Sequence, residues 1–250
     1  MKMAKYTDSK KTRNLLSRAK ELSKEKGFFY VVRAGFRRAF INPLSYRYCK
    51  YFKSDRTFTF GGDTYRYFIH KYNTTWRNER AVELPIIWKI VKKYQGKRIL
   101  EVGNVLSHYF HVDHDILDKY ERSEGVINQD VVDFQPSEKY DLIVSISTLE
   151  HVGWDETPRE PLKILRAIKN LKSILAPKGK LVITLPLGHN SVLDELLRKG
   201  KIQFTRMYCL KRISRDNLWV ETNWKDIEHV QYDSPFNNAN GLVIGIIDKK

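Results

Sequence analysis

Four residues in the middle of the chain stand directly after short apolar runs, where they could bind a ligand. The run RILEV places Glu101 just before Gly103 and Asn104, and the next apolar run is followed by Asp118. Glycine lets the backbone turn sharply and approach a ligand closely. A carboxylate beside that turn suits a cationic amino group, and an acid after a second strand accepts hydrogen bonds from a ribose diol. We expect these four residues to share one ligand site.

The next two apolar segments add further candidates. Asp133 and Phe134 end the segment DVVDF, where they would lie beside an adenine amino group after a third strand. Ser147 follows the run YDLIVSI, which predicts a fourth strand. Ligands of doubly wound sheets bind where the carboxyl ends of the strands meet. We therefore expect these three residues at the same site.

The elements that would position these residues alternate between strands and helices after Gly96. Apolar runs predict strands at 98–102, 115–117, 125–128, 142–146, 180–185, 204–210 and 242–247, and a helix with Leu162, Leu165, Ile168, Leu171 and Leu175 on one face. This alternation is typical of an α/β fold with a mostly parallel sheet covered on both faces. The last two strands, joined by a long connection, could form an antiparallel edge pair. The sequence thus predicts a doubly wound, mostly parallel, seven-stranded sheet.

The chain divides into three predicted parts: a basic N-terminal extension at 1–60, a lid segment with a helix at 61–95, and the sheet domain at 96–250. Aromatic residues alternate at 57–72 around a Gly-Gly-Asp sequence, which predicts a β-hairpin or a short lid. A polar cluster then leads into an apolar helical stretch at 84–94.

From about residue 72 onward the chain resembles the class I S-adenosylmethionine-dependent methyltransferases. The resemblance rests on an ordered series of segments, RILEVGN, ILDKYE, NQDVVDF, YDLIVSISTLEHV and LAPKGKLVITLP. The LEHV sequence within the fourth is common among small-molecule and glycan methyltransferases. The resemblance implies a Rossmann-like fold with S-adenosylmethionine as cofactor. It places Glu101 and Gly103 at the methionine portion, Asp118 at the ribose, and Asp133 with Phe134 at the adenine.

The chain departs from the family pattern in the cofactor loop. Val105 and Ser107 stand where the family usually has further glycines. A side chain at Val105 would push the backbone away from the cofactor or require another loop path. No G-x-G-x-x-G run is present, which argues against a nicotinamide-dependent dehydrogenase.

The segment before the first predicted strand is rich in aromatic and hydrogen-bonding groups. In the family this segment commonly folds over the cofactor, so we expect Tyr72, Trp76 and Arg80 to help close the site, with Arg80 paired to a carboxylate. The alternative is a capped helix with a surface salt bridge.

Two histidines are candidates for the chemistry. Methyl transfer requires alignment of acceptor and methyl group, and a general base helps if the acceptor is a hydroxyl. His151 follows the fourth predicted strand and His189 follows the fifth, and a histidine can take up a proton near neutral pH. The alternative for His151 is a structural or cofactor-side role. The three histidines at 108, 111 and 114 have no good tetrahedral spacing, so we predict no metal site.

The basic character of the chain is concentrated at its N-terminus. The net charge is +16, and residues 1–60 contain sixteen Lys or Arg and only four Asp or Glu. Residues 28–41 interleave phenylalanines with arginines at helical spacing, which predicts a basic amphipathic helix. This helix could pack on the main domain or lie on an anionic membrane surface. Two cysteines and no signal-like N-terminus favour a cytoplasmic protein, with peripheral contact at the inner membrane face as an option.

These observations favour an S-adenosylmethionine-dependent methyltransferase that acts on a hydroxyl of a small molecule or a lipid-linked glycan. A nucleic-acid methyltransferase is one alternative, but the sequence signature of base amino-methylation is absent after the fourth predicted strand. A binding module that retains the fold without turnover is another, because of Val105. The sequence indicates no oligomeric state.

Overall fold

A computed structural model describes residues 41–249, and the chain falls into two compact units, Met1–Tyr51 and Phe52–Lys250. In the first unit, the described residues form most of the helix α3 (Asn42–Phe52). The amphipathic helix predicted at 28–41 lies almost entirely outside the described residues. Within the described part, no helix is long and apolar enough to cross a membrane.

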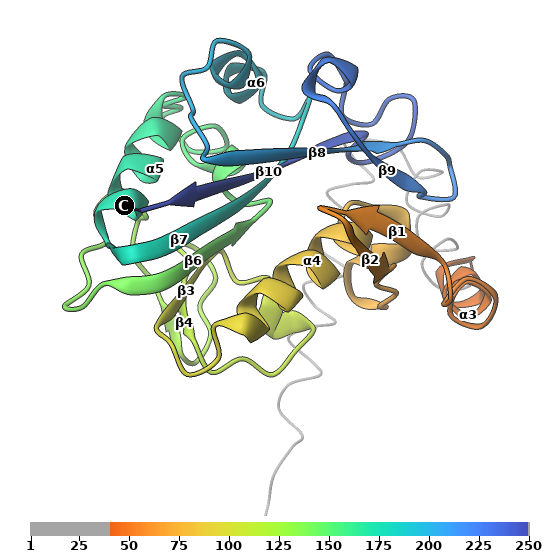
Figure 1. Ribbon diagram of the computed structural model, residues 1–250, viewed down its shortest axis with the longest axis horizontal. Coiled ribbons are helices and arrows are strands. Elements are labelled where there is room, and N and C mark those ends of the chain that lie inside the picture. Colours follow the sequence, from red (N-terminus) through yellow and green to blue (C-terminus); the bar gives the residue numbers. More distant parts are fainter. Residues whose placement is uncertain (1–40, 250) are drawn as a thin grey trace, which may run out of the picture. The chain divides into compact units, whose positions relative to one another are not determined.

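The second unit is built on an eight-stranded sheet with the order β5-β4-β3-β6-β7-β10-β8-β9 (Figure 1). The strands are β3 (Ile99–Val102), β4 (Asp115–Leu117), β5 (Val126–Ile127), β6 (Tyr140–Ile146), β7 (Leu175–Pro186), β8 (Arg206–Arg212), β9 (Trp219–Thr222) and β10 (Gly241–Asp248). The first five in spatial order pair in parallel, and β10, β8 and β9 add antiparallel pairs. The predicted doubly wound, mostly parallel α/β sheet is confirmed.

The sheet differs from the prediction at its antiparallel end. The strands near 204–210 and 242–247 do pair with each other, but β10 lies inside the sheet, between β7 and β8. Seven consecutive residues of β10 are buried, so this strand requires neighbours on both sides. The additional strand β9 forms the edge, with Val220 and Glu221 exposed. Its four residues show no apolar alternation long enough to predict a strand.

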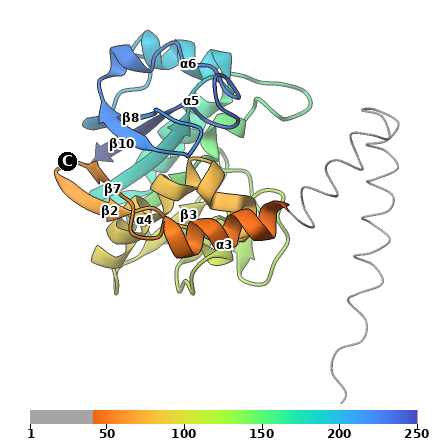
Figure 2. The same ribbon diagram turned by 90° about the vertical axis from the view of Figure 1, so that its right-hand side faces the viewer.

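The helices cover both faces of the sheet. On one face α5 (Lys163–Ser173) and α6 (Ser191–Arg198) bury a cluster that includes Ile143, Ile164 and Leu193. On the opposite face α4 (Arg80–Lys93) buries a second cluster. The two ribbon views agree on this arrangement (Figures 1 and 2). Each side of the sheet therefore has its own hydrophobic core.

The predicted helical face at 162–175 is correct at its centre and wrong at its ends. Ile168 and Leu171 are buried in α5, and Leu165 packs against the same core. Leu162 precedes α5 and is 57% exposed, whereas Leu175 begins β7. Ile164 and Ala167 complete the buried face, with Lys163 buried beside them.

The predicted hairpin forms from β1 (Thr57–Phe60) and β2 (Asp63–Arg66). Gly61 and Gly62 make the two-residue turn with φ of +58° and +82°, as the favoured hairpin turn requires. Phe58 and Phe60 point into the core on the α4 side. The hairpin therefore belongs to the second unit.

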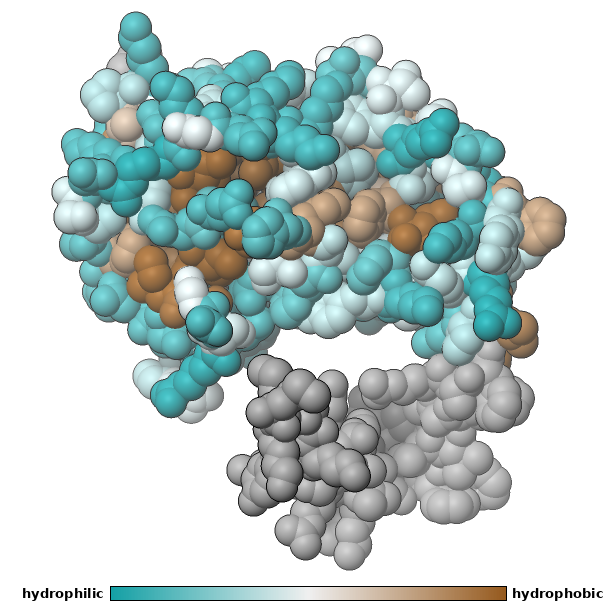
Figure 3. Space-filling model, turned by 90° about the horizontal axis from the view of Figure 1, so that it is seen from below, coloured by the Kyte–Doolittle hydropathy of each residue, from teal (hydrophilic) through white to brown (hydrophobic). Residues whose placement is uncertain are grey.

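Apolar residues also remain at the surface. Figure 3 shows one face on which apolar residues gather between projecting hydrophilic ones. Exposed apolar side chains are common on folded proteins, so this surface carries no functional argument by itself.

Asp194 in the first turn of α6 gives a testable pH dependence of stability. Its Oδ2 accepts a hydrogen bond from Gly188 N at 3.0 Å, whereas its buried Oδ1 has no partner among the described residues. Burial raises the pKa of Asp194 from 3.8 to about 6. The folded state thus holds this proton more tightly than the unfolded state. Stability from this group is present below pH 3.8 and is lost as the pH rises through about 6.

We therefore expect Asp194→Asn to gain stability relative to the parent protein as the pH rises from 4.5 to 7.5, by about 2 kcal/mol. Urea unfolding at the two pH values measures this difference. Glu195→Gln, at the next and exposed position, is the control and should show no such change. Equal pH profiles for Asp194→Asn and the parent would contradict the assignment.

Candidate functional site

A cavity of about 370 Å³ lies where the carboxyl ends of β3, β4 and β6 meet. This is the position at which doubly wound sheets bind ligands, and its size is that of a small-molecule site. Gly103 and Asp118 line it from the first two strands, and Asp130 lines it from the segment after β5. Thr148 and His151 line it after β6.

Gly103 is a closely packed point of the cavity wall. Its φ is +86°, a value that side chains rarely adopt. A Cβ at this position would lie 2.2 Å from the Thr148 Oγ1 atom and 2.7 Å from its Cγ2. Only glycine therefore allows β3 to turn beside the segment after β6.

Glu101 holds the loop after Gly103. Its side chain is fully buried, and its Oε1 accepts hydrogen bonds from Val105 N at 2.8 Å and Leu106 N at 2.7 Å. Its Oε2 lies 3.0 Å from His114 Nε2. The carboxylate is outside the cavity lining. Its direct contact with a cofactor amino group thus stays a prediction, while its role in fixing the loop is visible in the structure.

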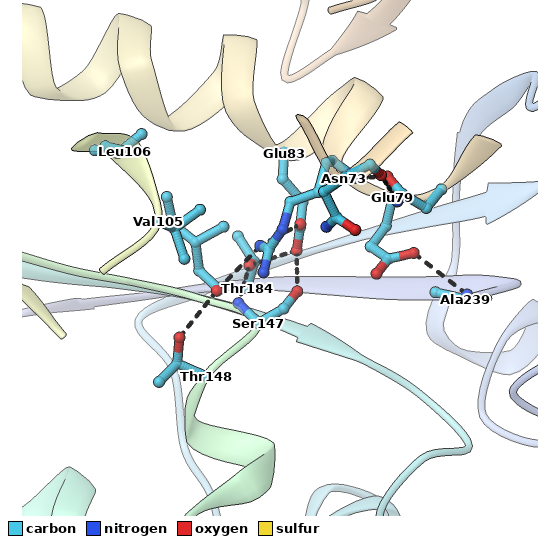
Figure 4. Close-up of polar contacts among 12 residues, drawn as sticks. Asn73, Glu79, Glu83, Val105, Leu106, Ser147, Thr148, Thr184 and Ala239 are labelled. Carbon is cyan, nitrogen blue, oxygen red and sulfur yellow. Dashed lines mark hydrogen bonds and ion pairs between the residues drawn. The ribbon is translucent and has the colours of Figure 1, made fainter. Parts of the chain in front are cut away.

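The loop follows a path that keeps Val105 out of the cavity. The Val105 side chain packs with the core on the α4 side, and the chain then forms the short 3-10 helix η3 (Leu106–His108) (Figure 4). Asn104 N donates to Asp118 Oδ2 at 3.2 Å, and Asn104 Nδ2 donates to Glu121 Oε1 at 2.7 Å. The side chain at Val105 therefore does not occupy the cavity.

Asp118 combines a structural contact with exposure to the cavity. Its Oδ1 accepts hydrogen bonds from Tyr120 N and Glu121 N, both at 2.8 Å, in addition to the Asn104 contact. Among the described residues, Oδ2 accepts only the Asn104 hydrogen bond and therefore retains acceptor capacity, so the group can still bind a ligand hydroxyl.

Asp133 and Phe134, predicted at the adenine, are outside the cavity lining, and their contact with the cofactor stays a prediction. Phe134 is buried in the core next to Tyr140, and exposed Asp133 is outside the cavity lining. Gln129 and Asp130 line the cavity instead. The irregular chain after β5 decides which residue faces inward, and the apolar pattern did not reveal that.

An ion network stabilises this wall of the cavity. Asp130 and Glu156 each pair with both Lys119 and Lys163, at 2.5 to 3.0 Å. Partial burial alone would raise the pKa of Asp130, but hydrogen bonds from Lys119 and Lys163 lower it to about 2. Sequence reasoning missed this network because its members are far apart in the chain.

We expect Asp118→Ala to weaken S-adenosylhomocysteine binding by about 30-fold or more, because the carboxylate both shapes the loop and faces the cavity. Asp133→Ala is the matched control and should change the dissociation constant less than about threefold. Isothermal titration calorimetry measures both. A larger loss of S-adenosylhomocysteine affinity for Asp133→Ala than for Asp118→Ala would favour the sequence-based placement of Asp133 at the adenine.

The predicted lid residues lie beside the cavity rather than in its lining. The Tyr72 ring stacks on His108 with centroids 4.5 Å apart and is 49% exposed. Arg80 Nη1 donates to Glu83 Oε2 at 2.9 Å and to Ile146 O at 3.0 Å. The predicted carboxylate pairing of Arg80 thus occurs inside the protein, and the surface salt bridge given as its alternative is not formed.

Ser147 belongs to the same buried network. Its Oγ donates to Glu83 Oε1 at 2.5 Å, and Thr184 Oγ1 donates to the same oxygen at 2.6 Å (Figure 4). Ser147 has a φ of +40°, which marks backbone strain at the end of β6. The network therefore connects α4 to β6 and β7 directly behind the cavity.

Two more buried carboxylates surround Arg80. Burial raises the pKa of Glu79 and of Glu150, and the charge of Glu83 raises both further. Glu79 Oε2 accepts a hydrogen bond from Ala239 N at 3.3 Å, whereas Glu150 Oε2 is buried without a partner among the described residues. Sequence reasoning did not identify either residue.

The two candidate catalytic histidines come together across 38 positions of the chain. His151 Nδ1 lies 2.5 Å from Asp155 Oδ2, and His189 Nε2 lies 3.6 Å from the same oxygen. The imidazole centroids are 4.9 Å apart. His151 and Asp155 line the cavity, whereas His189 is outside its lining. By contrast, His108, His111 and His114 each lie near a different acid.

Comparison with known proteins identifies the family. A family model described as "Methyltransferase domain" matches residues 78–235. No curated protein matches the chain significantly.

The chain is similar to several solved structures, among them NodS, TehB and KedS8. The N-methyltransferase NodS from Bradyrhizobium japonicum in complex with S-adenosyl-L-homocysteine has 12% identity and a TM-score of 0.39, over 67% of this chain and 87% of that chain. TehB from Haemophilus influenzae has 17% identity and a TM-score of 0.40, over 72% and 65%. The sugar N-methyltransferase KedS8 from a Streptoalloteichus species has 13% identity and a TM-score of 0.35, over 69% and 89%.

These structural likenesses are too distant to indicate an acceptor. The family match, in contrast, spans more than half of the chain and includes the whole cavity wall from β3 to β7. The chain belongs to the methyltransferase domain family and is an S-adenosylmethionine-dependent methyltransferase.

Proposed function

We propose that the protein methylates a hydroxyl group of a small molecule or a glycan. The observation that carries the proposal is the position of the His151, Asp155 and His189 side chains, two of which line the cavity. A hydroxyl becomes an adequate nucleophile only when its proton can leave. Two imidazoles beside a carboxylate assist that departure.

The cavity fits S-adenosylmethionine, which supplies an electrophilic methyl group on a sulfonium when bound. The close approach that Gly103 permits and the carboxylate of Asp118 are features that a nucleoside-type ligand requires. Gly103 would hold the cofactor through its backbone, and Asp118 would accept hydrogen bonds from ribose hydroxyls. Because Val105 lies outside the cavity, the loop gives no reason to expect loss of binding.

The test combines binding with product analysis. Calorimetry with S-adenosylmethionine and S-adenosylhomocysteine should show binding, and mass spectrometry after incubation with small-molecule and sugar acceptors should show a methyl ether. His151→Ala should lower turnover about 100-fold or more. It should have little effect on the dissociation constant of S-adenosylhomocysteine, whose binding we assign to Asp118. Methylation at nitrogen alone, or binding without any turnover, would refute hydroxyl methylation.

We also propose a peripheral contact of the N-terminal extension with the cytoplasmic membrane face. Its support is the excess of basic residues in 1–60 and the interleaved phenylalanines and arginines at 28–41. Cosedimentation with vesicles should be strong for anionic lipid and absent for neutral lipid. Equal recovery of the protein with anionic and with neutral vesicles would contradict this contact. Removal of residues 1–40 without any change in recovery with anionic vesicles would contradict it as well.

A further inference from the structure

Three side chains at the cavity wall and next to it form a group of metal-ligating type. His151 belongs to the 3-10 helix η4 (Leu149–His151) after β6, Asp155 follows four residues later, and His189 lies in the turn after β7. One potential ligand atom from each residue lies within 4.8 Å of the other two. The fold therefore brings two imidazoles and one carboxylate to a single point.

His189 provides a separate observation. Its Nε2 atom is buried and has no hydrogen-bond partner among the described residues. The 3.6 Å separation from Asp155 Oδ2 is too long for a hydrogen bond. A buried polar nitrogen without a partner is costly, and a bound cation would satisfy it.

The distances agree with a small cation. With metal–ligand bonds of about 2 Å, the ligand atoms of a tetrahedral site lie about 3.3 Å apart. The 3.6 Å between His189 Nε2 and Asp155 Oδ2 is close to that value, whereas the 2.5 Å between His151 Nδ1 and Asp155 Oδ2 is a hydrogen bond that a bound cation would replace.

The donor set selects the kind of cation. Imidazole nitrogens favour Zn²⁺, Mn²⁺ or Fe²⁺ over Ca²⁺ and Mg²⁺, which prefer oxygen ligands. Three protein ligands leave a coordination position open, as in catalytic metal sites. Because His151 and Asp155 line the cavity, that open position can be reached from it.

We propose that His151, Asp155 and His189 bind a divalent transition-metal cation. This inference deepens the proposed hydroxyl methylation, and the role of the cation in the reaction rests on that proposed function. The cation would coordinate the acceptor hydroxyl and lower the pKa of that hydroxyl. The imidazoles would then act as ligands, and the hydroxyl proton would leave to solvent.

Metal binding is tested on the full-length protein without reference to activity. After chelator treatment, Zn²⁺ titration by calorimetry should give one ion per chain, and Co²⁺ should give visible absorption bands of a nitrogen- and oxygen-ligated site. His189→Ala and Asp155→Asn should each weaken Zn²⁺ binding by about 100-fold or more. His111→Ala is the matched control, since His111 is exposed and remote from the cavity, and it should bind as the parent does. Absence of Zn²⁺ binding, or equal binding by His189→Ala and the parent, would overturn the proposal.

A second measurement separates this inference from the proposed function. Chelation should lower methyl ether formation about 100-fold, and added Zn²⁺ or Mn²⁺ should restore it, with S-adenosylhomocysteine affinity unchanged. Full activity in the chelated protein would overturn the metal proposal and leave hydroxyl methylation standing. Zn²⁺ binding lost in His189→Ala, together with methylation at nitrogen alone, would support the metal site and overturn hydroxyl methylation.

Discussion

Gly103→Ala is expected to abolish measurable cofactor binding, with a loss of about 100-fold or more. The added Cβ would lie 2.2 Å from Thr148 Oγ1, and the backbone at φ +86° is itself unfavourable for alanine. Relief of the clash requires β3 and the segment after β6 to separate, and both line the cavity. Calorimetry with S-adenosylhomocysteine measures the loss of binding, and urea unfolding measures the accompanying loss of stability.

Gly125→Ala separates backbone strain from the clash. Gly125 has a φ of +79°, close to that of Gly103, but a Cβ there would meet no atom within 4 Å. We expect it to cost about 1 kcal/mol of stability and to leave cofactor affinity unchanged. Comparable affinities of the Gly103→Ala and parent proteins would show that the turn is not part of the cofactor site.

The sequence was sufficient for those parts of the site that depend on strand order. Gly103, Asp118 and His151 each stand at or after the end of an apolar run, and parallel pairing brings such ends together. That Asp130 rather than Asp133 lines the cavity could not be predicted in this way, because the chain after β5 is irregular. A displacement of three positions there has no signature in the apolar pattern.

Buried polar contacts between distant segments were also beyond sequence reasoning. Glu83 contacts Ser147 and Thr184, which lie 64 and 101 positions away in the chain. A glutamate in an apolar helix is ordinarily assigned to its exposed side. Only the packing of α4 on the sheet shows that Glu83 is fully buried.

That buried carboxylate leads to a second large expected effect. Glu83→Ala should destabilise the protein by about 3–5 kcal/mol, because it leaves the Arg80 guanidinium without its ion pair in a buried position. The substitution also removes the acceptor for the Ser147 and Thr184 hydroxyl groups. Urea unfolding at constant pH measures the change. Lys89→Ala removes an exposed ion pair of the same helix and should have little effect, because solvent screens such pairs.

A double-mutant cycle distinguishes the network from a simple loss of side-chain volume. In the parent protein, Ser147→Ala should cost about 1–2 kcal/mol, because its hydroxyl donates to the buried Glu83 carboxylate group. In the Glu83→Ala background the same substitution should cost almost nothing, since the acceptor is gone. Equal costs in both backgrounds would show that the contact contributes no coupling. Because Ile146 ends β6 and Ser147 follows it directly before Thr148 of the cavity wall, loss of the coupling should also weaken S-adenosylhomocysteine binding.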